Sequence, residues 1–295
     1  MSDYIISCCS TADLSKEHFE RRNISYISFH FFMDEKEYLD DLGQSLPFEE
    51  FYKAMENGVV TRTSQINAYE FKDYFEKYLK EGKDIIHLCL SSGISGVYNS
   101  ACMAKDMLEK TYTGRKIYIV DTLGASSGYG LLTDIAADLR DSGLSIDELY
   151  EKIESIKLKV NHWFFSTDLK YYVRGGRISK VSGWVGTILK ICPLLNMDKA
   201  GKLIPREKIR TKAKAIDRIV LKMTEYADNG TDYDGKCYIC HSSCIEDAEA
   251  VKNKIESKFK NLKNKVEIYS IGTTIGSHTG PGTVALFFCG KERNE

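Results

Sequence analysis

Three short segments rich in glycine and hydroxyl residues carry groups that could bind an anion. The first, residues 91–96, reads Ser-Ser-Gly-Ile-Ser-Gly between an apolar segment and a helical pattern. Hydroxyls and unpaired backbone N–H groups at a helix start can hold an anion. The same pattern is typical of an ordinary turn in which a serine caps the helix. Ser92 and Ser95 are therefore candidate binding residues, with capping as the open alternative.

The second segment, residues 61–65, reads Thr-Arg-Thr-Ser-Gln and precedes another helical pattern. Asn67 and Glu70 stand at capping-box spacing, which assigns the capping of that helix to Asn67. Thr63 and Ser64 are left without a structural role, although a hydroxyl in a turn needs no function. They are candidate ligand-binding residues.

The third segment, residues 276–282, places His278 among glycines and predicts a tight turn between the last two strands. A histidine in such a turn is not a core residue on an apolar face. Its ring N–H can donate to a carboxylate, and a nearby anion would favour its charged form. The competing interpretation is an exposed turn residue with no partner, because loop position favours function only on average.

Two arginines flank a glycine pair after a predicted helical turn at residues 168–173. Arg174 and Arg177 could dock an acidic group or a phosphate. A solvated helix end is the commoner reason for this pattern. The apolar stripe that follows, over residues 181–189, has helical spacing and favours plain core over a ligand tunnel.

The cysteines do not predict a metal site. Cys237, Cys240 and His241 match the pattern of c-type haem attachment and, with Cys244, a possible zinc cluster. Residues three apart on a strand point to opposite faces, so we expect Cys237 and Cys240 to diverge as buried thiols. The odd total of nine cysteines also argues against a complete disulfide framework.

The first half of the chain alternates near-continuous apolar strands with amphipathic helices, which predicts a parallel sheet covered on both faces. Strands are predicted at residues 4–8, 25–29, 84–90 and 116–120, and helices at 48–57, 68–80, 96–109 and 128–142.

The second half combines a hairpin with βαβ elements, which predicts a partly antiparallel sheet. Strands are predicted at residues 191–197, 202–209, 236–241, 266–271 and 283–289, and helices at 145–160, 211–228 and 245–259. The expected fold is therefore α/β with two domains, residues 1–160 and 161–295.

Charge and hydropathy argue against several classes of protein. Of 295 residues, 41 are basic and 42 acidic, and this balance gives no argument for nucleic acid. The N-terminal residues lack the pattern of a signal peptide, and no apolar run has the length of a membrane-spanning helix. We expect a cytoplasmic protein with reduced cysteines and at most transient contact with a membrane surface.

Taken together and in this order, four segments resemble the DegV family of bacterial fatty-acid-binding proteins. They are Thr-Ser-Gln at residues 63–65, Ser-Ser-Gly-Ile-Ser-Gly-Val-Tyr at 91–98, Gly-Gly-Arg-Ile at 175–178, and His-Thr-Gly-Pro-Gly at 278–282. The order of strands and helices also fits over essentially the whole chain. One departure is Ile66-Asn67, where the family often has Pro-Ser.

This resemblance implies an N-terminal parallel-sheet α/β/α domain, a C-terminal mixed-sheet α/β domain, and a long-chain fatty acid between them. Thr63 and Ser95 would hydrogen-bond its carboxylate, and His278 would approach from the C-terminal domain. The chain would catalyse nothing and need no cofactor. It would present the fatty acid to a separate ATP-dependent fatty acid kinase, which makes an acyl phosphate for phospholipid synthesis. Arg174 or Arg177 would serve the kinase contact or the phosphate.

Two other functions stay open from the residues alone. One is a serine hydrolase acting on acyl esters with Ser95, Asp121 and His278. Val97 stands where the nucleophile motif Gly-x-Ser-x-Gly requires its last glycine, which argues against this alternative. The other is an α/β protein that binds a small sugar or a phosphate and has no acyl tunnel.

Overall fold

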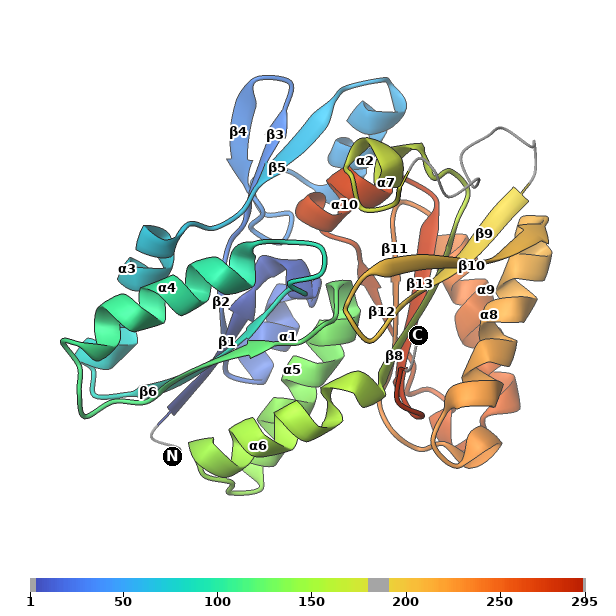
Figure 1. Cartoon of the computed structure of the whole chain (residues 1–295). Helices are drawn as coiled ribbons and strands as arrows, with labels where there is room; N and C mark the ends of the chain where they lie inside the picture. Colours follow the sequence, from blue (N-terminus) through green and yellow to red (C-terminus); the bar gives the residue numbers. More distant parts are fainter. Residues whose placement is uncertain (1–3, 180–190, 294–295) are drawn as a thin grey trace.

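The computed structural model describes residues 4–179 and 191–293 (Figure 1). The predicted apolar stripe at residues 181–189 lies outside the described residues. Three sheets organise the rest of the chain, with strand orders β2-β1-β6-β7, β4-β3-β5 and β10-β9-β8-β13-β11-β12.

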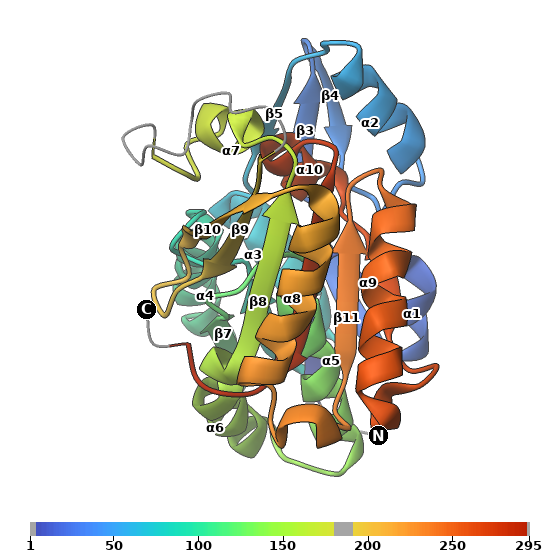
Figure 2. The ribbon, with the colours of Figure 1, turned by 90° about the vertical axis from the view of Figure 1, so that its right-hand side faces the viewer.

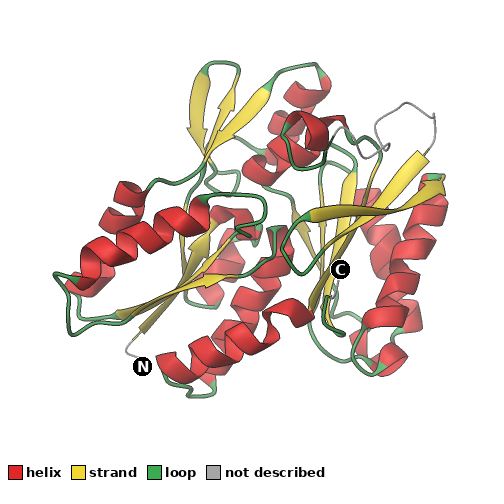
Figure 3. Cartoon of the chain, viewed as in Figure 1, coloured by secondary structure: helices red, strands yellow, loops and turns green. Residues whose placement is uncertain are grey.

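The four-stranded sheet is parallel, as the apolar segments predict. Its strands are β1 (Tyr4–Cys9), β2 (Ile24–Ile27), β6 (Asp84–Cys89) and β7 (Ile117–Asp121). Its helices are α1 (Lys16–Arg21), α3 (Ala68–Lys80), α4 (Val97–Glu109), α5 (Ser126–Asp141) and α6 (Ile146–Ile156). Figure 3 shows the sheet between the pair α3 and α4 and the pair α5 and α6, the doubly covered arrangement expected of a parallel sheet.

Two capping boxes begin helices where the sequence predicts them. Asn67 accepts the backbone N–H groups of Tyr69 and Glu70, and the Glu70 side chain accepts the Asn67 N–H at 2.7 Å. Ser145 and Glu148 form the same reciprocal pair at the start of α6. Each pair satisfies N–H groups that the first turn leaves unpaired.

A small antiparallel sheet was not predicted. It contains β3 (His30–Met33), β4 (Lys36–Leu39) and β5 (Thr61–Ser64), and helix α2 (Phe48–Glu56) packs against it. The prediction of a turn at residues 61–65 is therefore wrong for Thr63 and Ser64, which lie on β5. Pairing with β3 holds residues 61–64 in an extended conformation. This segment is too polar to show the apolar–polar alternation of a strand by itself.

The third sheet has six strands and is mixed, because β11 pairs parallel with β12 and the other neighbours are antiparallel. Its strands are β8 (Val160–Ser166), β9 (Ile191–Met197), β10 (Leu203–Arg210), β11 (Cys237–His241), β12 (Glu267–Ser270) and β13 (Thr283–Cys289). Helices α8 (Lys212–Tyr226) and α9 (Ile245–Lys258) cover its outer face (Figure 2). The predicted α/β fold, parallel in the first part and mixed in the second, is confirmed.

Short helices complete the described chain. They are α7 (Lys170–Arg174), α10 (Thr273–Thr279) and the 3₁₀ turns η1 (Ser10–Ala12), η2 (Lys157–Lys159), η4 (Gly230–Asp232) and η5 (Lys260–Leu262). The prediction of a tight turn at residues 276–282 is wrong in part, because His278 lies in the last turn of α10. Among the described residues, no helix combines the length and hydrophobicity needed to cross a membrane.

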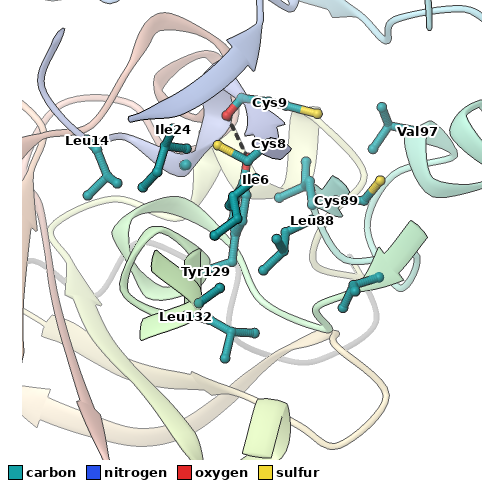
Figure 4. Packing of buried hydrophobic residues seen from close by; sticks show 14 of the residues in the cluster. Ile6, Cys8, Cys9, Leu14, Ile24, Leu88, Cys89, Val97, Tyr129 and Leu132 are labelled. Carbon is teal, nitrogen blue, oxygen red and sulfur yellow. Dashed lines mark hydrogen bonds between the residues drawn. The ribbon is translucent and has the colours of Figure 1, made fainter. Parts of the chain in front are cut away.

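Helix α5 lies between the parallel sheet and the mixed sheet and contacts both (Figure 1). A Cβ at Gly130 would lie 2.4 Å from the carbonyl oxygen of Ala12, and one at Gly128 would lie 2.3 Å from Nε2 of His162. Glycine at both positions therefore permits the close packing. Tyr129 of α5 points into the core and donates to the carbonyl of Cys9 at 3.0 Å (Figure 4).

The predicted divergence of two strand cysteines is confirmed. Cys237 packs with the helices on the outer face of the mixed sheet, and Cys240 packs in the core that faces α5. Burial raises the pKa of both thiols, Cys240 to about 12. All nine cysteines are free, and no group of metal-binding side chains is found within residues 4–179 and 191–293.

Candidate functional site

A cavity of about 890 Å³ lies between the small sheet, the loops after the parallel strands and the inner face of the mixed sheet. Most of its wall is apolar and includes Phe29, Leu90, Phe164, Met197, Ala285 and Phe287. Thr63, Ser64, Ser95, Arg174, Arg177 and His278 also line it. Four of the six come from the segments that the sequence singles out for hydroxyls or a histidine, the other two are the arginine pair, and all six were predicted site residues.

Thr63 and His278 are brought together from opposite ends of the chain. The Thr63 Oγ1 atom lies 2.8 Å from Nε2 of His278. Strand β5 holds Thr63 through its pairing with Phe31 of β3. Helix α10 presents His278 from the segment between β12 and β13.

Arg177 lies beside Thr63 and His278 and forms hydrogen bonds with three segments. Its Nη2 and Nε atoms donate to the carbonyl oxygen of Ile94 at 3.0 and 3.2 Å, and its Nη1 donates to that of Gly175 at 2.6 Å. Nη1 also lies 3.3 Å from Nδ1 of His278. Arg177 thus joins α7, α10 and the loop before α4.

The partners of His278 define its neutral tautomer. Because a guanidinium can only donate, Nδ1 of His278 accepts from Arg177, and the ring proton is on Nε2. Nε2–H then donates to Thr63 Oγ1, which leaves the Thr63 O–H free to donate into the cavity. Burial, reinforced by Arg177 and Arg174, lowers the pKa of His278 to about 3. The ligand-free histidine is therefore neutral, unlike the charged form that we expected beside an anion.

The loop at residues 91–96 lies at the start of α4 and also lines the cavity. Ser95 lines the cavity and its Oγ accepts the Val97 N–H at 3.2 Å, but the N-cap of α4 is Gly96, which makes no side-chain capping bond. Ser91, which the sequence did not single out, is buried and donates to the carbonyl of Gly201 at 2.8 Å. A Cβ at Gly93 would lie 2.4 Å from the carbonyl oxygen of Ala200, so this loop packs directly on the β9–β10 hairpin.

The other predicted residues lie nearer to solvent. Ser64 is exposed at the cavity rim. Ser92 is exposed and does not line the cavity, and its N–H donates to the Asp121 carboxylate. Arg174 is exposed, with its guanidinium 5.1 Å from the centre of the Tyr171 ring.

The hydrolase residues do not form a triad in the described part of the chain. His278 contacts Thr63 and Arg177, whereas Asp121 accepts the backbone N–H groups of Ser92 and Leu123. A serine nucleophile needs a base within hydrogen-bond reach and a third group that orients the base.

Two buried aspartates that sequence reasoning missed hold the start of α10. Asp13 accepts the Gly272 N–H at 3.0 Å and Asp40 accepts the Thr274 N–H at 3.3 Å. Burial and the nearby Asp40 raise the pKa of Asp13, and burial raises that of Asp40. Nothing in the sequence around Asp13 or Asp40 predicts a contact with a helix more than 200 residues later.

We expect His278 to remain neutral in the ligand-free protein well below pH 6.5. Its folded pKa of about 3 lies below the ordinary value of about 6.5, so the unfolded chain binds more protons between these pH values. This residue therefore stabilises the fold less as the pH falls from about 6.5 towards 3. The ring signals of His278, assigned by their loss in His278→Gln, should not titrate between pH 8 and 5 in an NMR experiment. A midpoint near pH 6.5 would contradict the burial argument.

Comparison with known proteins gives matches over the whole chain. A family model described as "Uncharacterised protein, DegV family" matches residues 6–291. A DegV domain-containing protein of Clostridium perfringens is 36% identical over 293 residues, which cover 99% of each chain. The crystal structure of DegV, a fatty acid binding protein from Bacillus subtilis, has a TM-score of 0.83 at 28% identity and covers 99% of this chain and 100% of that one. A Thermotoga maritima structure described as revealing a fatty acid binding function has a TM-score of 0.84 at 27% identity, with the same coverage.

Proposed function

This chain belongs to the DegV family, and on that premise we propose that it binds a long-chain fatty acid in the cavity. The carboxylate would accept from Thr63 and Ser95, with His278 beside them orienting the Thr63 hydroxyl through its Nε2–H, and the acyl chain would lie along the apolar wall. The binding of fatty acids by the related B. subtilis and T. maritima proteins supports this proposal.

The observation that carries the proposal is that Arg177, His278 and Thr63 are connected by hydrogen bonds in an otherwise largely apolar cavity. Burying about ten methylenes at about 0.8 kcal/mol each would contribute about 8 kcal/mol before ordering costs. A buried carboxylate without hydrogen-bond partners would oppose binding, so hydrogen-bond donors are needed where the carboxylate lies. The free O–H of Thr63 and the nearby guanidinium meet that need.

We further propose that the chain is a carrier of the fatty acid and leaves the chemistry to an ATP-dependent kinase subunit, with residues 1–160 and 161–295 as two domains around the ligand. Arg174 is the better candidate for the kinase contact, because it is exposed at the cavity while Arg177 is engaged by three internal partners. No cofactor other than the bound fatty acid is part of the proposal.

Native mass spectrometry of the protein purified from cells tests the function most directly. We expect a retained mass that corresponds to a long-chain fatty acid, and its loss after delipidation. Protein that carries no acyl chain, and that takes up none from a micromolar fatty acid solution, would contradict the proposal.

Ser95 and Ser92, two of the three serines in residues 91–96, supply a matched test of the carboxylate site. We expect Ser95→Ala to weaken fatty-acid binding by about 10- to 100-fold, because a hydrogen bond to a charged group contributes about 1.5–3 kcal/mol. Ser92→Ala should bind like the parent, since Ser92 is exposed and outside the cavity wall. Displacement of a fluorescent fatty acid measures both, and equal affinities would remove Ser95 from the site.

A further inference from the structure

One face of strands β8 and β13 forms a row of residues along the wall of the cavity, and the two ends of this row differ in chemistry. Along β8 and β13, the paired residues on the face toward the cavity are Ser166 with Thr283, Phe164 with Ala285, and His162 with Phe287, and all of them except Ser166 line it. Intervening residues such as Trp163 and Phe165 pack with the helices on the other face of the sheet. Four residues of strand correspond to about 13 Å, so the row spans much of an extended acyl chain.

One end of this row adjoins the proposed carboxylate site. The Tyr172 hydroxyl of α7 lies 3.0 Å from Thr283 Oγ1, which donates to Ser166 at 3.1 Å. Gly175, three residues after Tyr172, approaches His278 so closely that a Cβ there would lie 2.3 Å from Nδ1 of His278. The opposite end of the row, at His162 and Phe287, lies away from that site, and both of its side chains are buried, so we call it the deep end of the cavity.

His162 fills that deep end against the beginning of α5. Its side chain is buried, and its ring centre lies 5.3 Å from that of Phe287 in an edge-on arrangement. Cβ atoms built at Gly124 and Gly128 would lie 2.9 and 2.3 Å from Nε2 of His162. The ring thus occupies the space that lies between β8 and the first turn of α5.

Both ring nitrogens of His162 are engaged by the protein. Nδ1 lies 3.0 Å from the carbonyl oxygen of Val160, to which it must donate, so Nε2 carries no proton and accepts the Ala125 N–H at 3.4 Å. Burial, with Arg293 nearby, lowers the pKa of His162 well below its ordinary value. The ring is neutral and has no nitrogen left for a ligand.

Next to this end, Arg293 forms hydrogen bonds with two loops, one before α5 and one between β9 and β10. Its Nη1 donates to the carbonyl oxygens of Leu123 and Asp198 at 2.8 and 2.9 Å. Leu123 lies two residues before Ala125, so the backbone that contacts His162 is held in place. The end of the cavity is therefore held by hydrogen bonds as well as by packing.

Building on the proposed fatty-acid function, we infer that His162 is the plug that sets the maximum acyl chain length and requires an unsubstituted methyl end. Each further methylene that the cavity accommodates should strengthen binding about fourfold, until the chain meets the ring. A terminal hydroxyl or carboxylate would be buried beside a ring that offers it no hydrogen bond.

The test measures affinities for saturated fatty acids of 14, 16, 18 and 20 carbons by displacement of a fluorescent fatty acid. In the parent, affinity should rise with length and then fall at a break point. His162→Ala should move that break point to longer chains and raise the affinity ratio of the next longer acid to the parent optimum by about tenfold or more. A fatty acid with a terminal carboxylate should bind the parent at least tenfold more weakly than its unsubstituted equivalent.

Three further variants keep the outcome interpretable. His162→Phe retains a ring and should keep the parent break point. His162→Asn retains an acceptor for the Ala125 N–H and should move the break point if the alanine variant does not fold. Val284→Ala loosens the neighbouring strand β13 from the other face of the sheet and should leave chain-length preference unchanged.

A fall in affinity that is equal for all chain lengths in His162→Ala and His162→Asn would overturn the inference while leaving fatty-acid binding intact. A parent protein that binds none of the four acids would overturn both the inference and the proposed function.

Discussion

Replacing Arg177 with alanine is expected to weaken fatty-acid binding by about 10- to 100-fold, because a hydrogen bond to a charged group contributes about 1.5–3 kcal/mol. The variant removes a cation beside the site and also the donor that fixes the His278 tautomer. Without Arg177, the proton of His278 is free to move to Nδ1, and Thr63 must then donate to Nε2 instead of to the ligand.

The same change leaves two half-buried backbone acceptors without the donor that they have in the parent. Arg177 donates to the carbonyl oxygens of Ile94 and Gly175, and burial lowers its pKa without discharging it. We therefore expect Arg177→Ala to lower the free energy of unfolding by about 1–3 kcal/mol. Arg177→Lys should recover part of the binding, because a lysine retains the charge but not the planar set of donors.

Arg174→Ala is the matched control, since it removes an equal charge from an exposed position. Its fatty-acid affinity should stay within about twofold of the parent, as expected of a surface charge. If Arg174 contacts the kinase, ATP-dependent formation of acyl phosphate should slow in this variant when the kinase is present. Equal affinities for Arg177→Ala and the parent would contradict the role assigned to Arg177. Acyl phosphate formed without a kinase would contradict the carrier proposal.

Regular elements with strong local signals are predictable from this sequence. The predicted helix at residues 48–57 is α2 (Phe48–Glu56), and the strand predicted at 283–289 is β13 (Thr283–Cys289). Apolar periodicity and capping residues act over one or two turns, so the sequence itself contains them.

Contacts between distant segments were less predictable. Thr63 belongs to a strand because β3, some thirty residues earlier, pairs with it, and the polar segment has no alternation of its own. His278 ends a short helix whose first N–H groups are held by Asp13 and Asp40. These acids come from the other end of the chain, so no local pattern connects them with the histidine that they help to place.

Asp134 of α5 is the centre of a buried ionic network that connects the two halves of the chain. It accepts from Arg22 Nε at 2.5 Å and from the Tyr238 hydroxyl at 2.6 Å, and it contacts Lys236. His18 Nε2 lies 3.2 Å away. Arg22 and His18 precede the mixed sheet in sequence, whereas Lys236 and Tyr238 lie at or within β11, so the network crosses between the parallel and mixed sheets.

We expect Asp134→Asn to lower the free energy of unfolding at pH 7 by about 3–5 kcal/mol, because it removes the buried carboxylate that pairs with the half-buried Arg22 and Lys236. Burial alone would raise the pKa of Asp134, but hydrogen bonds from His18, Lys236 and Tyr238 hold it well below its ordinary value. This stabilisation is present above pH about 3.9 and is lost as the pH falls towards the folded pKa. The difference between parent and variant in urea unfolding should therefore shrink below about pH 4.

Asp138→Asn is the control for this effect, because Asp138 pairs with the same Arg22 and Lys236 but has a half-exposed side chain. Its loss should cost at most about 1 kcal/mol, since solvent screens exposed ion pairs. If both variants lost the same free energy of unfolding, burial of Asp134 would not be what makes the network strong. A large loss confined to Asp134→Asn would instead show that the two sheets around the cavity are held together by a single buried charge and its donors.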